Sequence, residues 1–409
     1  MRRVAITGLG VVSALGVGTD TFWKGLSAGT SGTRRVTLVD PALVNVPIAA
    51  EVPDFDAERL LPGISLDLLD RFSQLALVAG REAVGDAGLV LTDAERDRAG
   101  VSIGTGVGGA GTQDVLYRRY YGEHIHRAHP YSIPRTMNSA ASSQVGMAFG
   151  LRGPGICVST ACASGGHSIG EAFEMIRAGR ADVMLAGGAD APITVPVIKV
   201  WEAVRVLANA DDPTTACRPF SRNRLGIVLG EGAGVLVLED WDRAIGRGAR
   251  IHAELVGYGA TADAGHITQP GVDAPAHAIR TALEQAHLDP TEIQYVNAHG
   301  TGTLLNDATE TTILRRVFGA HANRLAVSST KSMVGHTMGA SGAIEIVATI
   351  LALRHQTAPP TINYTEPDPE CDLDYVPNTA KRMPIQAAIS NSFAFGGLNA
   401  VLAVRRSAA

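Results

Sequence analysis

The feature that most limits the fold of this chain is a regular alternation of short apolar runs with amphipathic stretches. Five runs rich in β-branched and small residues predict buried strands: RVAITGLG at residues 3–10, AGVSIGTG at 99–106, GICVST at 155–160, DVMLAGG at 182–188 and GAGVLVLED at 232–240. Amphipathic periodicity predicts helices over residues 71–88 and 170–179. This alternation is typical of an α/β fold in which helices cover the sheets.

A second feature is a faint internal repeat. VSTACASGGHSIG near residue 158 resembles SSTKSMVGHTMG near residue 328, and VSIGTG at 101 resembles VNAHGTG at 296. A duplicated α/β unit would produce two such halves, so we predict an N-terminal half over residues 1–250 and a C-terminal half over residues 251–409. Residues 105–150 are richer in Tyr, His and Pro, and we expect them to form an excursion that caps the core.

Composition excludes several classes of protein. With 45% hydrophobic and 18% charged residues and a net charge of -5, the chain is typical of a soluble globular protein and not of a nucleic-acid-binding one. Its four cysteines contain no CxxC pair, so we expect no disulfide framework and no metal site, and a reducing cytoplasm fits. The sequence contains no run of 18 apolar residues, so we expect no membrane span.

Cys162 lies in VSTACASG, among small residues, where a predicted strand meets a predicted helix. Most cysteines in such places are small buried residues. A helix start, however, favours a thiolate and is expected to lower the pKa of the thiol to ~7 or less. Free N–H groups at the same place can stabilise an oxyanion. These residues alone leave both interpretations open.

Two histidines share a setting that is rich in Gly, Ser and Thr. His299 lies in NAHGTGTLLND and His336 in SSTKSMVGHTMGASGAIE, each after a predicted strand. Imidazoles can donate hydrogen bonds to a developing enolate or oxyanion. Lys331, one of only four lysines, precedes His336 by five residues, and Glu345 follows on the predicted helix. A buried Lys–Glu pair would bias the electric field of the site, although structural ion pairs look the same.

The segment GTGVGG, residues 104–109, formally matches the GxGxxG pattern of dinucleotide-binding sites. No well-placed acidic residue follows it, so a glycine turn near a cleft is the better interpretation. Near the C-terminus, SNSFAFGGLNA predicts a second polar, glycine-rich turn.

Together these motifs resemble the β-ketoacyl-acyl carrier protein synthases, specifically the decarboxylating synthase II type of fatty acid and type II polyketide systems. The resemblance runs nearly end to end, through RVAITGLGVVSALG, GLRGPGICVSTACASG, GEGAGVLVLE, NAHGTGT, SSTKSMVGHTMGASGAIE and NSFAFGG. It implies a thiolase-type duplicated fold with five layers in the order α-β-α-β-α. It also implies a dimer, formed either by two copies of this chain or with a chain-length factor.

The resemblance assigns Cys162 as the acyl-accepting nucleophile and so overturns the structural interpretation of that residue. His299 and His336 would support decarboxylation and condensation. Lys331 would be the charged neighbour that orders the site, with Glu345 as its partner. The chemistry would be ping-pong: the acyl group passes to Cys162, and malonyl-carrier protein then loses CO2 and attacks the thioester.

Further roles implied by the resemblance concern the substrate. The backbone N–H groups of Cys162 and Phe395 would form an oxyanion hole, and Phe395 would gate the site between acyl and malonyl binding. Thr301 and Thr303 would bind the phosphopantetheine arm of acyl carrier protein, which carries both substrates. The chain itself would bind no cofactor. Basic docking contacts for the acidic carrier protein would be Arg71 and Arg205.

Several positions depart from the pattern of the family. RPFSRNRLGIVLGEGAG and the C-terminal turn contain the departures Ser221, Asn223, Leu225, Ile227, Ala394 and Leu398. We expect all of them near the gate and the acyl chamber, with Ile227 lining the chamber where relatives have Phe. They favour a type II polyketide or specialised fatty acid pathway over housekeeping elongation.

Three alternatives have specific counter-indications. A synthase primed from acyl-coenzyme A would use a Cys-His-Asn site, which His336 in its glycine-rich block argues against. A degradative thiolase would need a second catalytic cysteine, and Cys371 in PECDLDY lacks a suitable context. A non-catalytic chain-length factor would lack the active-site cysteine, so Cys162 argues against it.

Overall fold

Two five-stranded arrays form the centre of the molecule, whose computed structural model describes residues 1–407. The strands of the first array, in spatial order, are β1 (Val4–Ser13), β8 (Gly232–Asp240), β7 (Val183–Asp190), β5 (Ala99–Gly104) and β6 (Gly155–Ile156). Those of the second array are β9 (Ala253–Ala262), β15 (Leu398–Arg405), β14 (Ala387–Ala394), β10 (Tyr295–Asn297) and β11 (Ala326–Ser328). A short antiparallel pairing of β1 with β9 joins the arrays into one continuous sheet.

The second array repeats the first. In each array the first strand pairs antiparallel with the second and the second with the third, whereas the third pairs parallel with the fourth and the fourth with the fifth. The duplication predicted from the sequence is therefore confirmed. Below, the first half means the elements around β1 and β5–β8, and the second half means those around β9–β11, β14 and β15.

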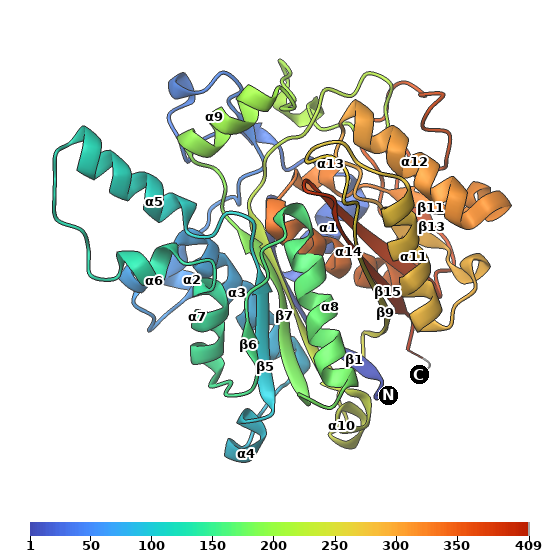
Figure 1. Cartoon of the computed structure of the whole chain (residues 1–409), viewed down its shortest axis with the longest axis horizontal. Coiled ribbons are helices and arrows are strands. Elements are labelled where there is room, and N and C mark those ends of the chain that lie inside the picture. Colours follow the sequence, from blue (N-terminus) through green and yellow to red (C-terminus); the bar gives the residue numbers. More distant parts are fainter. Residues whose placement is uncertain (408–409) are drawn as a thin grey trace.

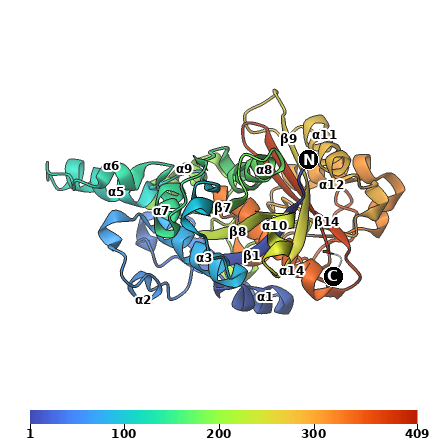
Figure 2. The same ribbon diagram turned by 90° about the horizontal axis from the view of Figure 1, so that it is seen from below.

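Helices form three layers around these arrays (Figures 1 and 2). On the outer face of the first array lie α3 (Arg71–Ala87) and α7 (Ala140–Phe149), and on the outer face of the second lie α11 (Asp273–Ala286) and α12 (Leu304–Phe318). Between the arrays lie α8 (Ser164–Arg177) and α14 (Ser341–His355), which contact each other and strands of both arrays. The predicted five-layer α-β-α-β-α architecture is confirmed.

The sequence of α14 explains its central place. Residues 341–353 are buried on every side of the helix, and nearly all of them are apolar or small. A helix that is apolar all round belongs in an interior, because no face of it gains from contact with water. α8 is more amphipathic, but its first turn also packs within the core and begins with Ser164, Gly165 and Gly166.

The prediction for α8 began six residues too late, at 170, because intrinsic propensity disfavours a glycine-rich helix start. Tertiary packing requires those glycines: a Cβ on Gly165 would lie 2.9 Å from the carbonyl oxygen of Gly339 at the start of α14. Strand β6 is also shorter than predicted, because the chain leaves the sheet after Ile156 to form the turn that carries Cys162.

The excursion at 105–150 does not simply cap the core. Its last helix, α7, packs on α3, but α5 (Ala110–Tyr117) and α6 (Ser132–Thr136) form an arm that projects from the body in both views (Figures 1 and 2). Most residues between 117 and 131 are exposed. The expectation of a cap was therefore wrong for this part of the segment.

The remaining elements are short, and most lie at the edge of the fold; the exception is α13 (Lys331–Val334), whose four residues are all buried. Small antiparallel pairs are β2 (Gly16–Val17) with β1, β3 (Arg34–Arg35) with β4 (Ile48–Ala49) and β12 (Thr357–Ala358) with β13 (Lys381–Arg382). The other helices are α1 (Thr19–Ala28), α2 (Ala57–Leu60), α4 (Asp93–Arg96), α9 (Val195–Val204), α10 (Trp241–Gly246) and α13 (Lys331–Val334). Within residues 1–407, no helix has both the length and the apolarity needed to cross a membrane.

The two halves share one further device, a sharp turn that enters the central helix. In the first half, the 3-10 turn Ala161–Ala163 leads into α8, and in the second, the 3-10 turn Met338–Ala340 leads into α14. We call residues 161–163 the first elbow and residues 338–340 the second elbow. The alignment of the repeat made from sequence is thereby corrected: TACASG at 160 corresponds to TMGASG at 337, not to the STKSMVG that precedes it.

Candidate active site

Cys162 lies at the first elbow, directly before α8, as its sequence context predicts. Ala161 has a φ of +51°, a left-handed conformation that non-glycine residues adopt only when their surroundings hold them there. The side-chain oxygen of Ser164 receives the N–H of Thr160 and donates to the carbonyl of Ala161, which braces the turn. Cys162 is only 6% exposed, yet it lines a cavity that reaches the surface.

His299 follows β10 in the second half, on a loop held by a buried carboxylate. The backbone N–H groups of His299 and Gly300 donate to the two oxygens of Glu310 on α12, at 2.9 and 2.7 Å. The side-chain amide of Asn391 on β14 donates to Glu310 at 3.1 Å. Burial raises the pKa of Glu310 to about 7, against the lowering effect of these hydrogen bonds. This network fixes the backbone that carries His299.

Hydrogen bonds define which ring nitrogen of each histidine carries the proton. Nδ1 of His336 accepts from the backbone N–H of Met338 at 3.3 Å and lies 2.9 Å from the hydroxyl of Ser341. Nδ1 of His299 lies 3.3 Å from Nζ of Lys331, and an ammonium group can only donate. Both Nδ1 atoms are therefore acceptors, so both protons lie on Nε2. The two rings are 5.5 Å apart, centroid to centroid, and nearly perpendicular.

The imidazoles of His299 and His336 are neutral at physiological pH. Burial lowers the pKa of each ring well below its usual value, and the positive charge of Lys331 lowers both further. A neutral ring with its proton on Nε2 is a hydrogen-bond donor that carries no charge of its own. Such a pair can stabilise negative charge that develops on a substrate oxygen.

Lys331 and Glu345 form the buried ion pair that their sequence positions suggest. Nζ of Lys331 bonds directly to Oε1 of Glu345, and both residues are 1% exposed. The same ammonium donates to the carbonyl oxygen of His299 at 2.7 Å. Burial raises the pKa of Glu345, and Lys331 opposes that shift. Neither side chain lines the cavity, so the pair acts on it through His299 and through its electric field.

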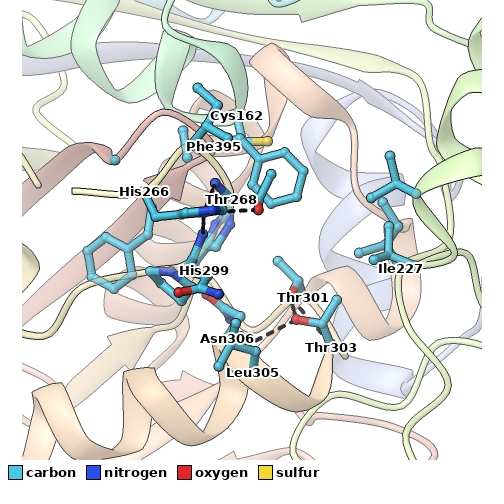
Figure 3. A pocket seen from close by; sticks show the side chains of 18 of the residues that line it. Cys162, Ile227, His266, Thr268, His299, Thr301, Thr303, Leu305, Asn306 and Phe395 are labelled. Carbon is cyan, nitrogen blue, oxygen red and sulfur yellow. Dashed lines mark hydrogen bonds between the residues drawn. The ribbon is translucent and has the colours of Figure 1, made fainter. Parts of the chain in front are cut away.

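One cavity of about 380 Å³ brings the predicted site residues together. Its walls include Cys162, Ile227, His299, Thr301, Thr303, His336 and Phe395. Figure 3 shows Cys162 and Phe395 on one side of this space, with His299, Thr301 and Thr303 on another and Ile227 across from them. Residues from both halves therefore meet in one space, although Cys162 and His336 are far apart in the sequence.

The expected low pKa of the Cys162 thiol is not found. Burial raises the pKa of this thiol to about 12, and the positive charge of Lys331 offsets only part of that rise. The prediction considered the helix start alone, whereas loss of solvent is the larger effect in a nearly closed cavity. Cys162 is thus held as a neutral thiol.

The two threonines and the phenylalanine lie toward the cavity mouth. The hydroxyls of Thr301 and Thr303 are 3.0 Å apart, and that of Thr303 also receives the backbone N–H of Asn306 at the start of α12. Phe395 is 39% exposed, and its ring stacks on Trp201 of α9 at 5.7 Å between centroids. An aromatic pair thus lies at the opening, from one residue of each half.

The departures from the family pattern do not all lie near the cavity, as expected. Ile227 and Ala394 line it, and Ile227 is 3% exposed. Ser221 and Asn223 instead bond to each other and to the segment at 365–366. Leu225 is exposed on the surface, and Leu398 begins β15; neither contributes to the walls. The expectation was wrong for Ser221, Asn223 and Leu225. Leu398 lies near the gate as expected, because it follows Gly397 and precedes Asn399, which both line the cavity, and it pairs with Ala394.

The two arginines predicted to dock a carrier protein differ. Arg71 makes a bidentate ion pair with the fully buried Glu231, with both distances at 2.6 Å, so it serves the structure rather than docking. Arg205 ends α9 beside the mouth, is exposed, and has no ion-pair partner among the described residues. Only Arg205 remains available for a partner.

Sequence reasoning missed a loop that forms one wall of the cavity. Residues 263–270, after β9, contribute Asp263, His266 and Ile267 to the lining. Asp263 holds this loop by accepting from the N–H of Gly271 at 2.8 Å and from the side chain of Asn399 at 2.7 Å. The cluster of Gly, Pro and polar residues in TADAGHITQPG was a loop signal that could have indicated it.

Comparison with known proteins agrees with this arrangement. Two family models match the chain: Beta-ketoacyl synthase, N-terminal domain, over residues 1–244, and Beta-ketoacyl synthase, C-terminal domain, over residues 252–365. The chain is 45% identical to Nodulation protein E of Rhizobium sp. (strain N33) over 408 residues, which cover 99% of each chain. It is 43% identical to 3-oxoacyl-[acyl-carrier-protein] synthase 2 of Staphylococcus aureus (strain N315), covering 99% of this chain and 98% of that protein. The structure of the ishigamide ketosynthase/chain length factor superposes with a TM-score of 0.93 and 39% identity over the whole of both chains.

Proposed function

Because the chain belongs to the β-ketoacyl synthase family, we propose that it condenses an acyl thioester held on Cys162 with a malonyl thioester carried by acyl carrier protein. One observation carries this proposal. A cysteine from the first half and two neutral imidazoles with their protons on Nε2, from the second, line one cavity. This set suits carbon–carbon bond formation between thioesters, and the chain is thus an acyltransferase.

The first part of the reaction uses the first elbow. The acyl group passes from the carrier thiol to the sulfur of Cys162, and the thiol proton goes to the departing pantetheine sulfur. During this transfer, negative charge develops on the acyl oxygen, and the backbone N–H groups of Cys162 and Phe395 would receive it. The phosphopantetheine arm would enter past Thr301 and Thr303, which line the cavity.

The second part uses the imidazoles. As the malonyl carboxylate leaves as CO2, the electron pair of the broken bond moves toward the thioester oxygen. The Nε2–H groups of His299 and His336 would donate to that oxygen and stabilise the enolate. Its carbon then attacks the carbonyl carbon on Cys162, and the sulfur leaves as thiolate. Lys331, held by Glu345, keeps His299 a donor throughout because it occupies Nδ1.

Carrier protein and a second subunit are the partners we propose. A curated relative at 43% identity is named for acyl-carrier-protein, and a structural neighbour is a ketosynthase/chain length factor. The first name supports substrates carried by acyl carrier protein, and we propose acyl and malonyl groups on its phosphopantetheine arm. That the chain itself binds no cofactor stays a prediction. The second name supports a dimer with a chain-length factor, and a dimer of two copies is the alternative; copurification from the native host would distinguish the two. A cytoplasmic location stays a prediction.

For the pathway, we propose specialised metabolism, either type II polyketide or specialised fatty acid synthesis. The relative at 45% identity is a nodulation protein, and Ile227 lines the cavity where the family usually has Phe. Housekeeping elongation is the competing assignment, supported by the relative at 43% identity. We further propose that residues 1–250 supply the nucleophile and residues 251–409 the imidazoles and the gating loop.

The test is incubation of the protein with several acyl-carrier proteins and malonyl-carrier protein, with product identification by mass spectrometry. A β-ketoacyl product and an acyl adduct on Cys162 are expected. The test variant is Cys162→Ala. Its matched control is Cys217→Ala, because Cys217 is also buried but lies outside the cavity. Cys162→Ala should lower condensation by roughly 10⁴-fold or more. A normal adduct in Cys162→Ala would refute the nucleophile assignment.

A further inference from the structure

Asp190, the last residue of β7, is a fully buried carboxylate that the chemistry above does not use. Its Oδ1 accepts from the hydroxyl of Thr105 at 2.5 Å and the N–H of Val107 at 3.2 Å. Its Oδ2 accepts from the N–H groups of Gly106 at 2.8 Å and Gly339 at 2.6 Å. No cation within residues 1–407 pairs with it. Burial raises the pKa of Asp190 to about 6, and the hydrogen bonds from these four uncharged donors oppose that rise.

These four donors belong to different halves of the molecule. Three lie on the loop after β5 in the first half, and the fourth, Gly339, is the middle residue of the second elbow, three residues after His336. The two backbones approach so closely that a Cβ on Gly339 would lie 2.3 Å from the backbone nitrogen of Gly106. No side chain fits between them, so the carboxylate of Asp190 is the polar group that joins the two segments.

Because the fold is duplicated, the contact between Asp190 and Gly339 can be compared with the equivalent place in the first half. Gly339 occupies in the second elbow the place of Cys162 in the first, and Asp190 is the eighth residue of β7 as Ala394 is the eighth of β14. Under the proposed function, the N–H of Cys162 binds an oxyanion that exists only during reaction. The equivalent N–H of Gly339 binds a group of the protein itself, the carboxylate of Asp190.

We propose that Asp190 is a positioning residue that fastens the second elbow, and with it His336, to the loop behind the first elbow, and so sets the spacing between imidazole and thiol. This inference rests on the proposed function. Asp190 does not touch the substrate, because its side chain is outside the cavity walls. It acts through Gly339 and the residues that Gly339 carries.

The negative charge of Asp190 also raises the pKa of the Cys162 thiol, which makes the thiol less reactive. After burial, which dominates, the charges that affect the pKa of Cys162 are Lys331, which lowers it, and Asp190 and Glu345, which raise it. The two nearby imidazoles are neutral. Removing the charge of Asp190 should therefore make the thiol more acidic, even as it releases the second elbow. A single substitution at Asp190 should therefore loosen the position of the second elbow and at the same time increase the acidity of the thiol.

The substitution is Asp190→Asn, which keeps the shape but loses the charge and turns one acceptor oxygen into a donor. Two of the four N–H or O–H donors would then face an NH2 group. We expect condensation to fall by roughly 10- to 100-fold, since small displacements of reacting groups have effects of that size. Alkylation of Cys162 by iodoacetamide at pH 8 should rise, by up to about tenfold for each unit that the pKa falls.

The matched control is Glu239→Gln, a buried carboxylate on β8 that is bound by Arg243 and Arg247 and lies outside the cavity walls. It should lower the melting temperature without raising alkylation. Wild-type protein assayed in parallel separates the two proposals, because absence of condensation there would refute the proposed function itself. If Asp190→Asn lowers condensation and alkylation together, or leaves condensation unchanged, the positioning role is refuted.

A second variant keeps the proposal testable if Asp190→Asn does not fold. Thr105→Val removes one donor to the carboxylate and nearly preserves volume, while Thr105→Ser keeps the hydroxyl. We expect Thr105→Val to lower malonyl decarboxylation several-fold with acyl adduct formation less affected, and Thr105→Ser to restore it. Equal rates for Thr105→Val and wild type would overturn the proposal.

Discussion

The first and second elbows have the same backbone and opposite chemistry. At residues 161–163, a positive φ at Ala161 turns the chain into α8 and presents Cys162 to the cavity. At residues 338–340, a positive φ at Met338 turns the chain into α14, but the middle residue is Gly339 and a carboxylate covers its N–H. Duplication supplied two identical turns, and only one of them carries a nucleophile.

The contrast extends to the charges around each elbow. The first half contributes mostly apolar side chains to the cavity, and Cys162 is its one titratable group among the described lining residues. The second half contributes both imidazoles, backed by the buried pair Lys331–Glu345. The thiol and the imidazole donors to the substrate oxygen thus come from separate halves, which allows variants to affect one half and spare the other.

The largest expected effect is on the ion pair of the second half. Lys331→Met would leave Glu345 buried without its partner, which typically costs about 3–5 kcal/mol of unfolding free energy. Urea unfolding would measure the loss. Lys381→Met is the control, because its pair with Asp374 is half exposed and such pairs contribute at most about 1 kcal/mol. A similar loss in both variants would show that burial of the pair has no special weight.

The imidazoles should separate the two parts of the reaction. His299→Ala and His336→Ala should each lower malonyl decarboxylation by roughly 10²- to 10³-fold, since each removes a preformed donor to the developing oxyanion. Acyl adduct formation should change less, because with its proton on Nε2 neither ring can accept the thiol proton. CO2 release and intact-protein mass spectrometry measure the two steps, with the exposed His277→Ala as control. An equal loss in both steps would contradict this division.

The wall of the cavity contributed by the first half should affect selectivity. Ile227→Phe narrows the space beside Cys162, so the ratio of kcat/KM for a bulky acyl chain over a short linear one should fall. Differences of a few methylene groups in an apolar pocket change selectivity by about 10- to 200-fold at most. Competition kinetics with the two acyl-carrier proteins would measure it. An unchanged ratio would make Ile227 a packing residue.

The smallest effect is expected at the mouth. Arg205→Ala should raise KM for the carrier-borne substrate about two- to fivefold, because one exposed charge contributes only that much to binding. The substitution should also weaken the dependence of KM on salt concentration. Arg71→Ala should instead lower stability, because it leaves Glu231 buried without its partner. If Arg71→Ala changed KM as Arg205→Ala does, the assignment of Arg71 to the structure would fail.

Much of the site could be predicted from the sequence because its chemistry is encoded in short contiguous motifs. Cys162, His299 and His336 each lie in a Gly- and Ser-rich segment that follows a strand, although α13 lies between β11 and His336. The duplication was also visible as two short matching segments. Its alignment was wrong at the elbow, because local similarity of STK to STA outweighed the correct pairing of TMGASG with TACASG.

What the sequence determined by itself was the set of chemical groups and the alternation of strands and helices in the first half, since both follow from local residue patterns. Tertiary structure alone decided the properties that depend on neighbours distant in the chain. The pKa of Cys162 rises because both halves close around it, and the proton of His299 lies on Nε2 because Lys331 occupies Nδ1. Asp190, the last residue of an apolar strand, shows no motif at all. Its role follows only from the approach of Gly339, because hydrogen bonds and desolvation depend on distance in space.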